Sequence, residues 1–491
     1  MFDKLKRLLK NSTIYTLGGV LSRATGLITI PVLTRYLTPG EYGILSVVSS
    51  VTGSLQFIYN MGLGASSTRY YYDLDSEIKR KSYFSTLFFF LIAAASLFSL
   101  LLMIFGDRLL APLLKREVPF YPYIAVALAT IFFNVFGVLP NALMRVREQA
   151  SLYTTVDFVR AISVMALSIF LVVVGGMGAL GPLLASLLIA PLAAGYFSYY
   201  LRPYLSLSFH WPMVRESIYF GIPTISERLC WWVLTASNRL FLLHYVSLPA
   251  AGIYSVSNLV GVALRLIGGS LNFAWTPFFY AIATEEREEE ARRIFAYAAT
   301  YYTLVIVCFG LALAVFAREV FHILAPRGYL AGLPVVPWVI LGSICEALYD
   351  IPSRGLYLMR RTQVLPFIML AAAAVNTVCN FTLIPHWGMT GAAWATLLGY
   401  AAMTLVTLKV SQRIYFVPYD YVRIGKIFVA AGAVYIAALW LAPEDLIFGI
   451  AVKAAVLGSF PLALYLSGFF AAAETRWMRE AARAVLRNRK P

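Results

Sequence analysis

The sequence is poor in charge, since only 13% of its 491 residues are Asp, Glu, Lys or Arg, against about 25% in a typical soluble domain. Hydrophobic residues make up 60% of the chain. This composition excludes an ordinary water-soluble enzyme. It also leaves no room for a sizeable soluble domain, because fourteen membrane spans of roughly 22 residues would use about 308 residues.

The side chains that most often bind metals or form disulfides are scarce as well. The four histidines are scattered, and the four cysteines lie in apolar segments without a CxxC spacing. This pattern favours neither a disulfide nor a metal site. The sequence has no P-loop, HExxH or GxSxG motif, so we expect no catalytic residues, no metal and no cofactor, and we expect that the protein is not an enzyme.

Long apolar runs recur along almost the whole chain and predict an all-α polytopic membrane protein. Cutting these runs at charges and at Pro/Gly clusters predicts fourteen transmembrane helices. They lie near residues 12–35, 42–66, 82–106, 119–143, 156–175, 180–201, 217–243, 249–282, 294–317, 329–357, 364–384, 389–408, 424–442 and 447–469.

Lys and Arg are distributed unequally between the alternate loops of this arrangement. With a cytoplasmic N-terminus, the segments on that side hold 27 of the 40 basic residues and the opposite side holds 6. Basic residues favour the cytoplasmic side of membrane proteins, so both termini are predicted to be cytoplasmic. The same rule and anionic lipids explain the net charge of +16, and we expect no nucleic-acid partner.

The chain contains an internal repeat. Residues 35–46 align with residues 244–255 at an offset of 209, with identity at Tyr36/Tyr245, Gly43/Gly252, Ile44/Ile253 and Ser46/Ser255. Each half holds six predicted spans, an even number, so the two halves have the same orientation in the membrane. Parallel repeats of this kind occur in transporters, where the substrate site lies between the repeats. We predict an N-lobe at 1–205, a C-lobe at 206–415, two extra spans at 416–471 and a basic cytoplasmic tail at 472–491.

Several arginines lie inside the predicted spans, where an isolated charge costs at least about 2.5–3.5 kcal/mol. Arg23, Arg228 and Arg265 lie near mid-depth, and we predict that they line a central water-filled cavity. Arg239 is a further candidate, although it lies close enough to a span end for snorkelling to explain it. A cavity lined by guanidinium groups suits an anionic substrate, because these groups pair with phosphate in a bidentate manner.

Three acidic residues inside the spans are candidates for ion or proton coupling. Glu346 and Asp350 are spaced four residues apart, with Arg354 four residues further on, so all three share one helix face. They could equally form a structural ion ladder or brace a neighbouring helix. Glu227, directly before Arg228, is equally open to a structural or a coupling role.

Three stretches resemble signatures of the polysaccharide exporters, the Wzx-type flippases of lipid-linked oligosaccharides. Residues 34–43 read TRYLTPGEYG, residues 376–396 read NTVCNFTLIPHWGMTGAAWAT, and the loop at 143–149 contains LMR and a final Gln. This family belongs to the superfamily of the multidrug and toxin extruders. The drug-extruding branch relies on an acidic residue in the first helix of a lobe. The first span of this sequence contains Arg23 and no acidic residue.

The resemblance implies two six-helix lobes in a V shape and alternating access. It implies a substrate that is a polyprenyl-pyrophosphate-linked glycan, such as an O-antigen (lipopolysaccharide), capsule or exopolysaccharide repeat unit. This glycan would move from the cytoplasmic to the outer leaflet of the inner membrane. Membrane lipids surround such a protein, a polysaccharide polymerase and a chain-length regulator are candidate protein partners, and a monomer is expected.

Other function classes stay open at this point. One is a proton- or sodium-coupled multidrug cation antiporter that uses Glu227. Another is a membrane-embedded glycan polymerase or ligase, and a third is a scramblase-like protein or an assembly scaffold.

Overall fold

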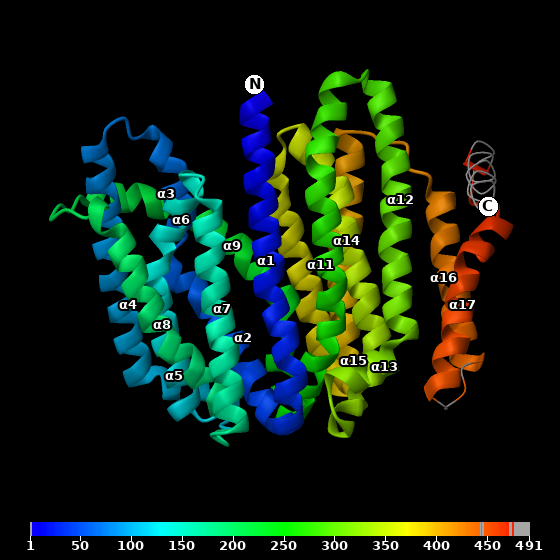
Figure 1. Cartoon of the computed structure of the whole chain (residues 1–491), viewed down its shortest axis with the longest axis horizontal. Helices are drawn as coiled ribbons and strands as arrows, with labels where there is room; N and C mark the ends of the chain where they lie inside the picture. Colours follow the sequence, from blue (N-terminus) through cyan, green and yellow to red (C-terminus); the bar gives the residue numbers. More distant parts are fainter. Residues whose placement is uncertain (1, 442, 444–445, 471–473, 476–491) are drawn as a thin grey trace, which may run out of the picture. The chain divides into compact units, whose positions relative to one another are not determined.

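The computed structural model describes residues 2–441, 443, 446–470 and 474–475, and these are almost entirely helical (Figure 1). No strand occurs among the residues described. The first eight helices are α1 (Phe2–Tyr36), α2 (Pro39–Asn60), α3 (Leu63–Tyr70), α4 (Glu77–Leu114), α5 (Ala125–Asn134), α6 (Val138–Val146), α7 (Ala150–Val173) and α8 (Leu180–Leu201). The later helices are α9 (Trp211–Ala236), α10 (Asn238–Tyr245), α11 (Leu248–Glu285), α12 (Glu288–Val315), α13 (Ala317–Leu324), α14 (Val336–Leu358), α15 (Leu365–Ile414), α16 (Tyr421–Leu441) and α17 (Leu446–Leu466).

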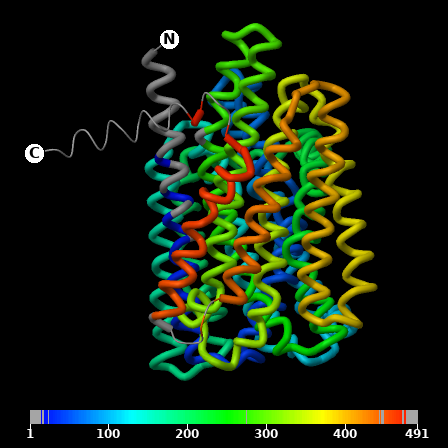
Figure 2. The backbone as a smooth tube through the Cα atoms, turned by 90° about the vertical axis from the view of Figure 1, so that its right-hand side faces the viewer, coloured from blue at the N-terminus to red at the C-terminus, as the bar shows by residue number. Residues whose placement is uncertain are grey.

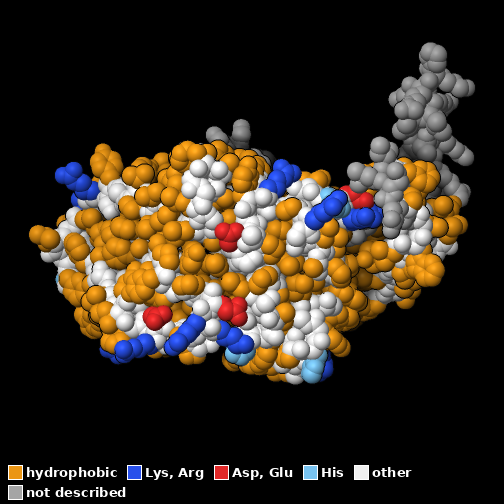
Figure 3. Space-filling model, turned by 90° about the horizontal axis from the view of Figure 1, so that it is seen from below, with side chains coloured by type: hydrophobic (Ala, Val, Ile, Leu, Met, Phe, Trp, Pro, Cys, Tyr) orange, Lys and Arg blue, Asp and Glu red, His pale blue; other side chains and the backbone are white. Residues whose placement is uncertain are grey.

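The predicted all-α membrane class is confirmed. Within the described residues, ten helical segments are long and apolar enough to cross a membrane. Hydrophobic side chains cover most of the face drawn in Figure 3, with charged groups in small scattered clusters. Among the described residues, the predicted spans fall largely on helix. The number of fourteen crossings stays a prediction, because length and hydropathy alone mark ten.

The chain folds into two compact units, each with its own core. The first unit comprises Met1–Gly261, Phe321–Gly342 and Thr362–Val406, and its main core packs apolar side chains of α2, α4 and α5 together. The second unit comprises Val262–Val320, Ser343–Arg361 and Thr407–Pro491. In it, α16 packs against both α12 and α17, and the tube of Figure 2 shows α16 and α17 side by side.

Helix α2 begins with a capping box formed by Thr38 and Glu41. The Thr38 side chain accepts a hydrogen bond from the backbone N–H of Glu41, and a Glu41 carboxylate oxygen accepts the backbone N–H of Thr38 at 2.8 Å. This capping box satisfies two N–H groups that would otherwise lack partners. Pro39 occupies the first turn, where its missing N–H costs nothing.

Two glycines that the sequence repeat aligns meet each other in the first unit. A Cβ added to Gly252 in α11 would lie 2.7 Å from the backbone nitrogen of Gly43 in α2 and 2.1 Å from the carbonyl oxygen of Pro39. Only a residue without a side chain permits this approach. The repeat partners Gly43 and Gly252 therefore pack backbone to backbone.

Helix α15 is divided by a break at Gly388, which has φ 53° and ψ −128°. These angles lie outside the helical region and in a region that glycine tolerates best. The break falls between the predicted spans 364–384 and 389–408, so the two helical parts of α15 correspond to these two predicted spans.

Candidate functional site

The four arginines predicted to line a cavity have different surroundings. Arg23 lies in α1, and its side chain lies outside the described part of the structure. Arg228 is exposed on α9 and, within the described residues, forms no ion pair. Arg239, at the start of α10, donates to the Ser255 hydroxyl at 2.8 Å and to the Thr235 carbonyl at 3.3 Å. Arg239 therefore links α9, α10 and α11 within the first unit.

Arg265 pairs with one of the predicted coupling residues inside the second unit. Its Nη1 lies 3.5 Å from a carboxylate oxygen of Glu346 and donates to the Ser343 hydroxyl at 3.3 Å. The two side chains are 23% and 16% exposed. The sequence assigned one residue to substrate binding and the other to coupling, whereas the structure brings them together as one pair of opposite charges.

The charged side chains on one face of α14 contact α11. Within the described residues, they do not form a continuous series of ion pairs along α14 itself. Arg354 donates to the side-chain oxygen of Asn272 in α11. Asp350 lies one turn from Arg354 and is influenced by its positive charge, but the described residues contain no ion pair between them. The two ends of this face, Glu346 and Arg354, thus each contact α11, and Asp350 lies between them.

The sequence analysis did not predict a second, largely buried ion pair. Lys453 in α17 donates to Glu319 in α13 at 2.7 Å, and the two side chains are only 12% and 14% exposed. Snorkelling would account for a lone lysine near a span end. No local pattern signals this partner, because 134 residues separate the two positions.

A cluster of neutral polar side chains lies buried in the first unit, and the sequence signalled it only in part. Asn380 donates to the side-chain oxygens of Asn376 and Asn238 at 3.0 and 2.9 Å. Asn238 in turn donates to the Tyr254 hydroxyl at 2.9 Å and to the Thr396 hydroxyl at 2.5 Å. Asn376, Asn380 and Thr396 belong to the stretch 376–396 that resembles the exporters, but nothing in the sequence pointed to Asn238. We name these five residues the amide cluster.

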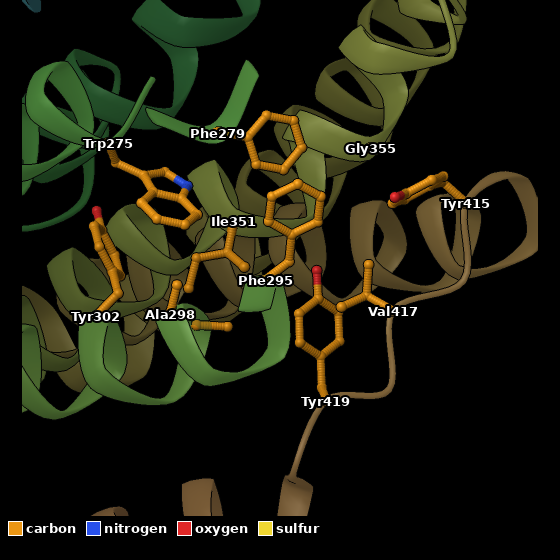
Figure 4. A pocket seen from close by; sticks show the side chains of 11 residues that line it. Trp275, Phe279, Phe295, Ala298, Tyr302, Ile351, Gly355, Tyr415, Val417 and Tyr419 are labelled. Atoms are coloured by element: carbon orange, nitrogen blue, oxygen red, sulfur yellow. The ribbon is translucent and has the colours of Figure 1, made fainter. Parts of the chain in front are cut away.

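A tight aromatic pocket occupies one part of the second unit, and its lining residues come from α11, α12, α14 and the segment after α15 (Figure 4). The rings of Phe279 and Phe295 stack with centroids 4.2 Å apart, and Trp275 packs against both. The free space is about 20 Å³, enough for roughly one water molecule. Desolvation by burial raises the pKa of the Tyr419 hydroxyl above its usual range. In this state the pocket cannot admit a sugar, so we assign it to packing.

Metal ligation gains no support from the described side chains. Among them, no three His, Cys, Asp or Glu groups lie close enough to hold a metal ion. All four cysteines are free thiols.

Comparison with known sequences decides the family. The profile of a family described as polysaccharide biosynthesis protein matches residues 8–283, more than half of the 491 residues. The chain belongs to the polysaccharide biosynthesis protein family. The matched range includes two of the three stretches that suggested the exporters, residues 34–43 and 143–149, so the resemblance is confirmed; the stretch at 376–396 lies beyond it.

One relative and two solved structures are similar to this chain. A protein of the Lsg locus of Haemophilus influenzae is 19% identical over 294 residues, which is 57% of this chain and 68% of that protein. The solved structure of the lipid II flippase MurJ, in an inward closed conformation, is similar with a TM-score of 0.72 and 13% identity, over 93% of this chain and all of the flippase.

An inward-facing multidrug resistance MATE transporter of the MOP superfamily is also similar. Its TM-score is 0.62 and its identity 15%, over 80% of this chain and 94% of that one. At these identities the likeness establishes the fold. This member of the polysaccharide biosynthesis family therefore has the helical fold of the lipid II flippase and of the MATE transporter.

Proposed function

We propose that the protein is a flippase that moves a polyprenyl-pyrophosphate-linked oligosaccharide from the cytoplasmic to the outer leaflet of the inner membrane. The observation that carries this proposal is the combination of its family with its fold. The family is one of polysaccharide biosynthesis, and the fold matches a lipid II flippase over 93% of the chain. A lipid-linked glycan is the substrate class that joins the two.

The proposed substrate site is a central cavity between the lobes at 1–205 and 206–415, with Arg23, Arg228, Arg265 and Arg239 as its cationic lining. Guanidinium groups would hold the pyrophosphate and any acidic sugar, while the lipid tail stays in the bilayer. The exposed side chain of Arg228 supports this role most directly. The spans at 416–471 and the tail at 472–491 lie outside this repeat, and most of the tail lies outside the described residues.

The proposed coupling step uses the acidic residues Glu227, Glu346 and Asp350. Protonation of Glu346 would cancel its attraction for Arg265 and leave that guanidinium available to a phosphate. The Glu346 carboxylate and the substrate phosphate would then compete for one cation, so proton binding at Glu346 and phosphate binding at Arg265 would favour each other. The proximity of the two side chains, 3.5 Å, supports the proposal.

The remaining proposals concern surroundings and chemistry. Both termini would face the cytoplasm, and the protein would act as a monomer among membrane lipids, with a polysaccharide polymerase and a chain-length regulator as candidate partners and no nucleic acid. It would act as a transporter and not as an enzyme, so its glycan would leave chemically unchanged and no cofactor would be required.

The test is glycan movement in proteoliposomes that contain the purified protein. A polyprenyl-pyrophosphate oligosaccharide starts in one leaflet, and an external glycosidase measures its arrival in the other. We expect movement with the wild type and a loss of about tenfold or more for Arg23→Ala combined with Arg228→Ala, since each charge-assisted hydrogen bond contributes about 1.5–3 kcal/mol. Arg360→Ala, at an exposed position between α14 and α15, is the matched control and should move the glycan normally.

One competing function, a cation antiporter, has a specific observation in its favour. The MATE transporter is similar over 80% of the chain, and Glu227 is exposed on α9, where a carboxylate could attract a cation. The same vesicles distinguish the two functions. Ion-driven efflux of organic cations that Glu227→Gln abolishes and Arg228→Ala retains, without glycan movement, would favour the antiporter.

A further inference from the structure

A pocket of about 500 Å³ opens at one end of α8 in the first unit. It does not include the predicted cavity arginines and is lined by the loop between α6 and α7, the last turn of α8 and the short turn that follows α8. The lining residues are Arg147, Gln149, Tyr199, Tyr200, Arg202, Pro203 and Tyr204. Two guanidinium groups and three phenol rings therefore share one opening.

The lining of this pocket is organised by contacts among its own side chains. The Arg147 guanidinium lies over the ring of Tyr204, 4.6 Å from its centroid. The Tyr200 hydroxyl donates to the side-chain oxygen of Gln149 at 2.5 Å. The loop that contains Gln149 is one of the stretches that the sequence singled out, and nothing in the proposed transport site uses it.

The two arginines of the pocket are not neutralised by an ion pair with a described acidic side chain. Among the described side chains, neither Arg147 nor Arg202 forms an ion pair, and both are exposed. Glu148 follows Arg147 in the sequence but does not line the pocket. An anion that enters would thus face two guanidinium groups.

The position of the pocket along α8 indicates what kind of anion could reach it. The apolar segment Leu180–Tyr204 is long and hydrophobic enough to cross a membrane, and the pocket lies at its last residues. Tyrosine concentrates at the level of lipid headgroups, where its ring meets acyl chains and its hydroxyl meets water. Basic pockets between transmembrane helices at this depth suit the phosphate of a lipid headgroup.

We propose that this pocket binds the phosphate of an anionic membrane phospholipid. Arg147 and Arg202 would bind the phosphate oxygens, for which guanidinium has the right geometry. The Tyr204 ring would hold Arg147 in place, and Tyr199 would lie against the glycerol and upper acyl region. The volume of 500 Å³ suffices for a glycerophosphate headgroup. The proposal does not rest on the flippase function, and it does not depend on which side of the membrane the pocket faces.

Native mass spectrometry of the detergent-solubilised full chain with added lipid tests the proposal. The probes are phosphatidylglycerol, phosphatidylcholine and inorganic phosphate. We expect phosphatidylglycerol to bind more tightly than phosphatidylcholine, and its affinity to fall about tenfold when Arg147→Gln and Arg202→Gln are combined. Tyr204→Leu should weaken binding less, because both charges remain.

The matched control is Arg360→Gln combined with Arg361→Gln, which removes two exposed charges that do not line this pocket. It should bind phosphatidylglycerol like the wild type. Equal binding by the pocket variant and this control would overturn the proposal, as would displacement of the lipid by inorganic phosphate at equal concentration. If the double Gln variant fails to fold, Arg147→Lys combined with Arg202→Lys replaces it, because this variant keeps both charges but loses bidentate pairing with phosphate. Wild-type affinity for phosphatidylglycerol in the Lys variant would count against the site.

Discussion

The pairing of Arg265 with Glu346 leads to a quantitative prediction about stability. At 3.5 Å and an effective dielectric constant near 20, opposite unit charges attract by about 5 kcal/mol. The side chains are 23% and 16% exposed, so water screens part of this attraction. We therefore expect Glu346→Gln, which leaves the Arg265 charge with the Ser343 hydroxyl alone, to lower the free energy of unfolding by about 2 kcal/mol.

A double-mutant cycle isolates the contribution of the pair. Arg265→Met alone should cost about as much as Glu346→Gln alone, because each leaves one partly buried charge behind. The combined variant should lose clearly less than the sum of the two, by about 2 kcal/mol. Unfolding is measured by titration with SDS in mixed micelles, followed by circular dichroism.

Glu227→Gln is the matched control for this cycle, because it makes the same chemical change at an exposed carboxylate. It should change the free energy of unfolding by less than about 0.5 kcal/mol. Additive losses from Arg265→Met and Glu346→Gln would show that the two charges do not interact and would refute the pairing on which the coupling proposal depends.

Three further predictions follow from contacts elsewhere in the two units. Lys453→Met should destabilise the protein by about 2–4 kcal/mol, because Glu319 is left buried and charged; adding Glu319→Gln should recover most of the loss in the same SDS titration, and no recovery would mean that the pair is not formed. Asn380→Ala should cost about 1–3 kcal/mol, since Asn238 and its other neighbours lose a hydrogen-bond partner; an unchanged SDS midpoint would contradict the amide cluster. Gly252→Val should sharply reduce the yield of folded protein in size-exclusion chromatography, because its side chain would meet the backbone beside Gly43; normal yield would contradict that close approach.

The class and helix positions were largely predictable because they depend on local hydropathy. The span predicted at 180–201 coincides with α8 (Leu180–Leu201). The helix that contains the span predicted at 82–106 is longer than that span, since α4 runs over Glu77–Leu114. Its start is set by the Ser76 side chain, which accepts the backbone N–H of Lys79. A helix extends as far as its caps permit, whereas a hydropathy window ends with the apolar run.

The candidate site was predictable in its residue types but not in its partners. The spacing of Glu346, Asp350 and Arg354 placed them on one face, because residues four apart are neighbours on a helix surface. The partners of Glu346 and Arg354 are Arg265 and Asn272 of α11, and their choice depends on how distant segments pack. The amide cluster illustrates the same limit, because Asn238 lies 142 residues from Asn380.

The most direct test of the flippase function reconstitutes the wild-type protein in vesicles with a lipid-linked oligosaccharide and then recovers the glycan. Glycosidase accessibility reports the leaflet, and mass spectrometry reports the chemical structure of the protected and exposed fractions. We predict that the glycan changes leaflet in vesicles that contain the protein, does not change leaflet in empty vesicles, and keeps its mass throughout. A glycan that stays in its original leaflet, or one that changes mass by sugar transfer, would contradict the flippase function.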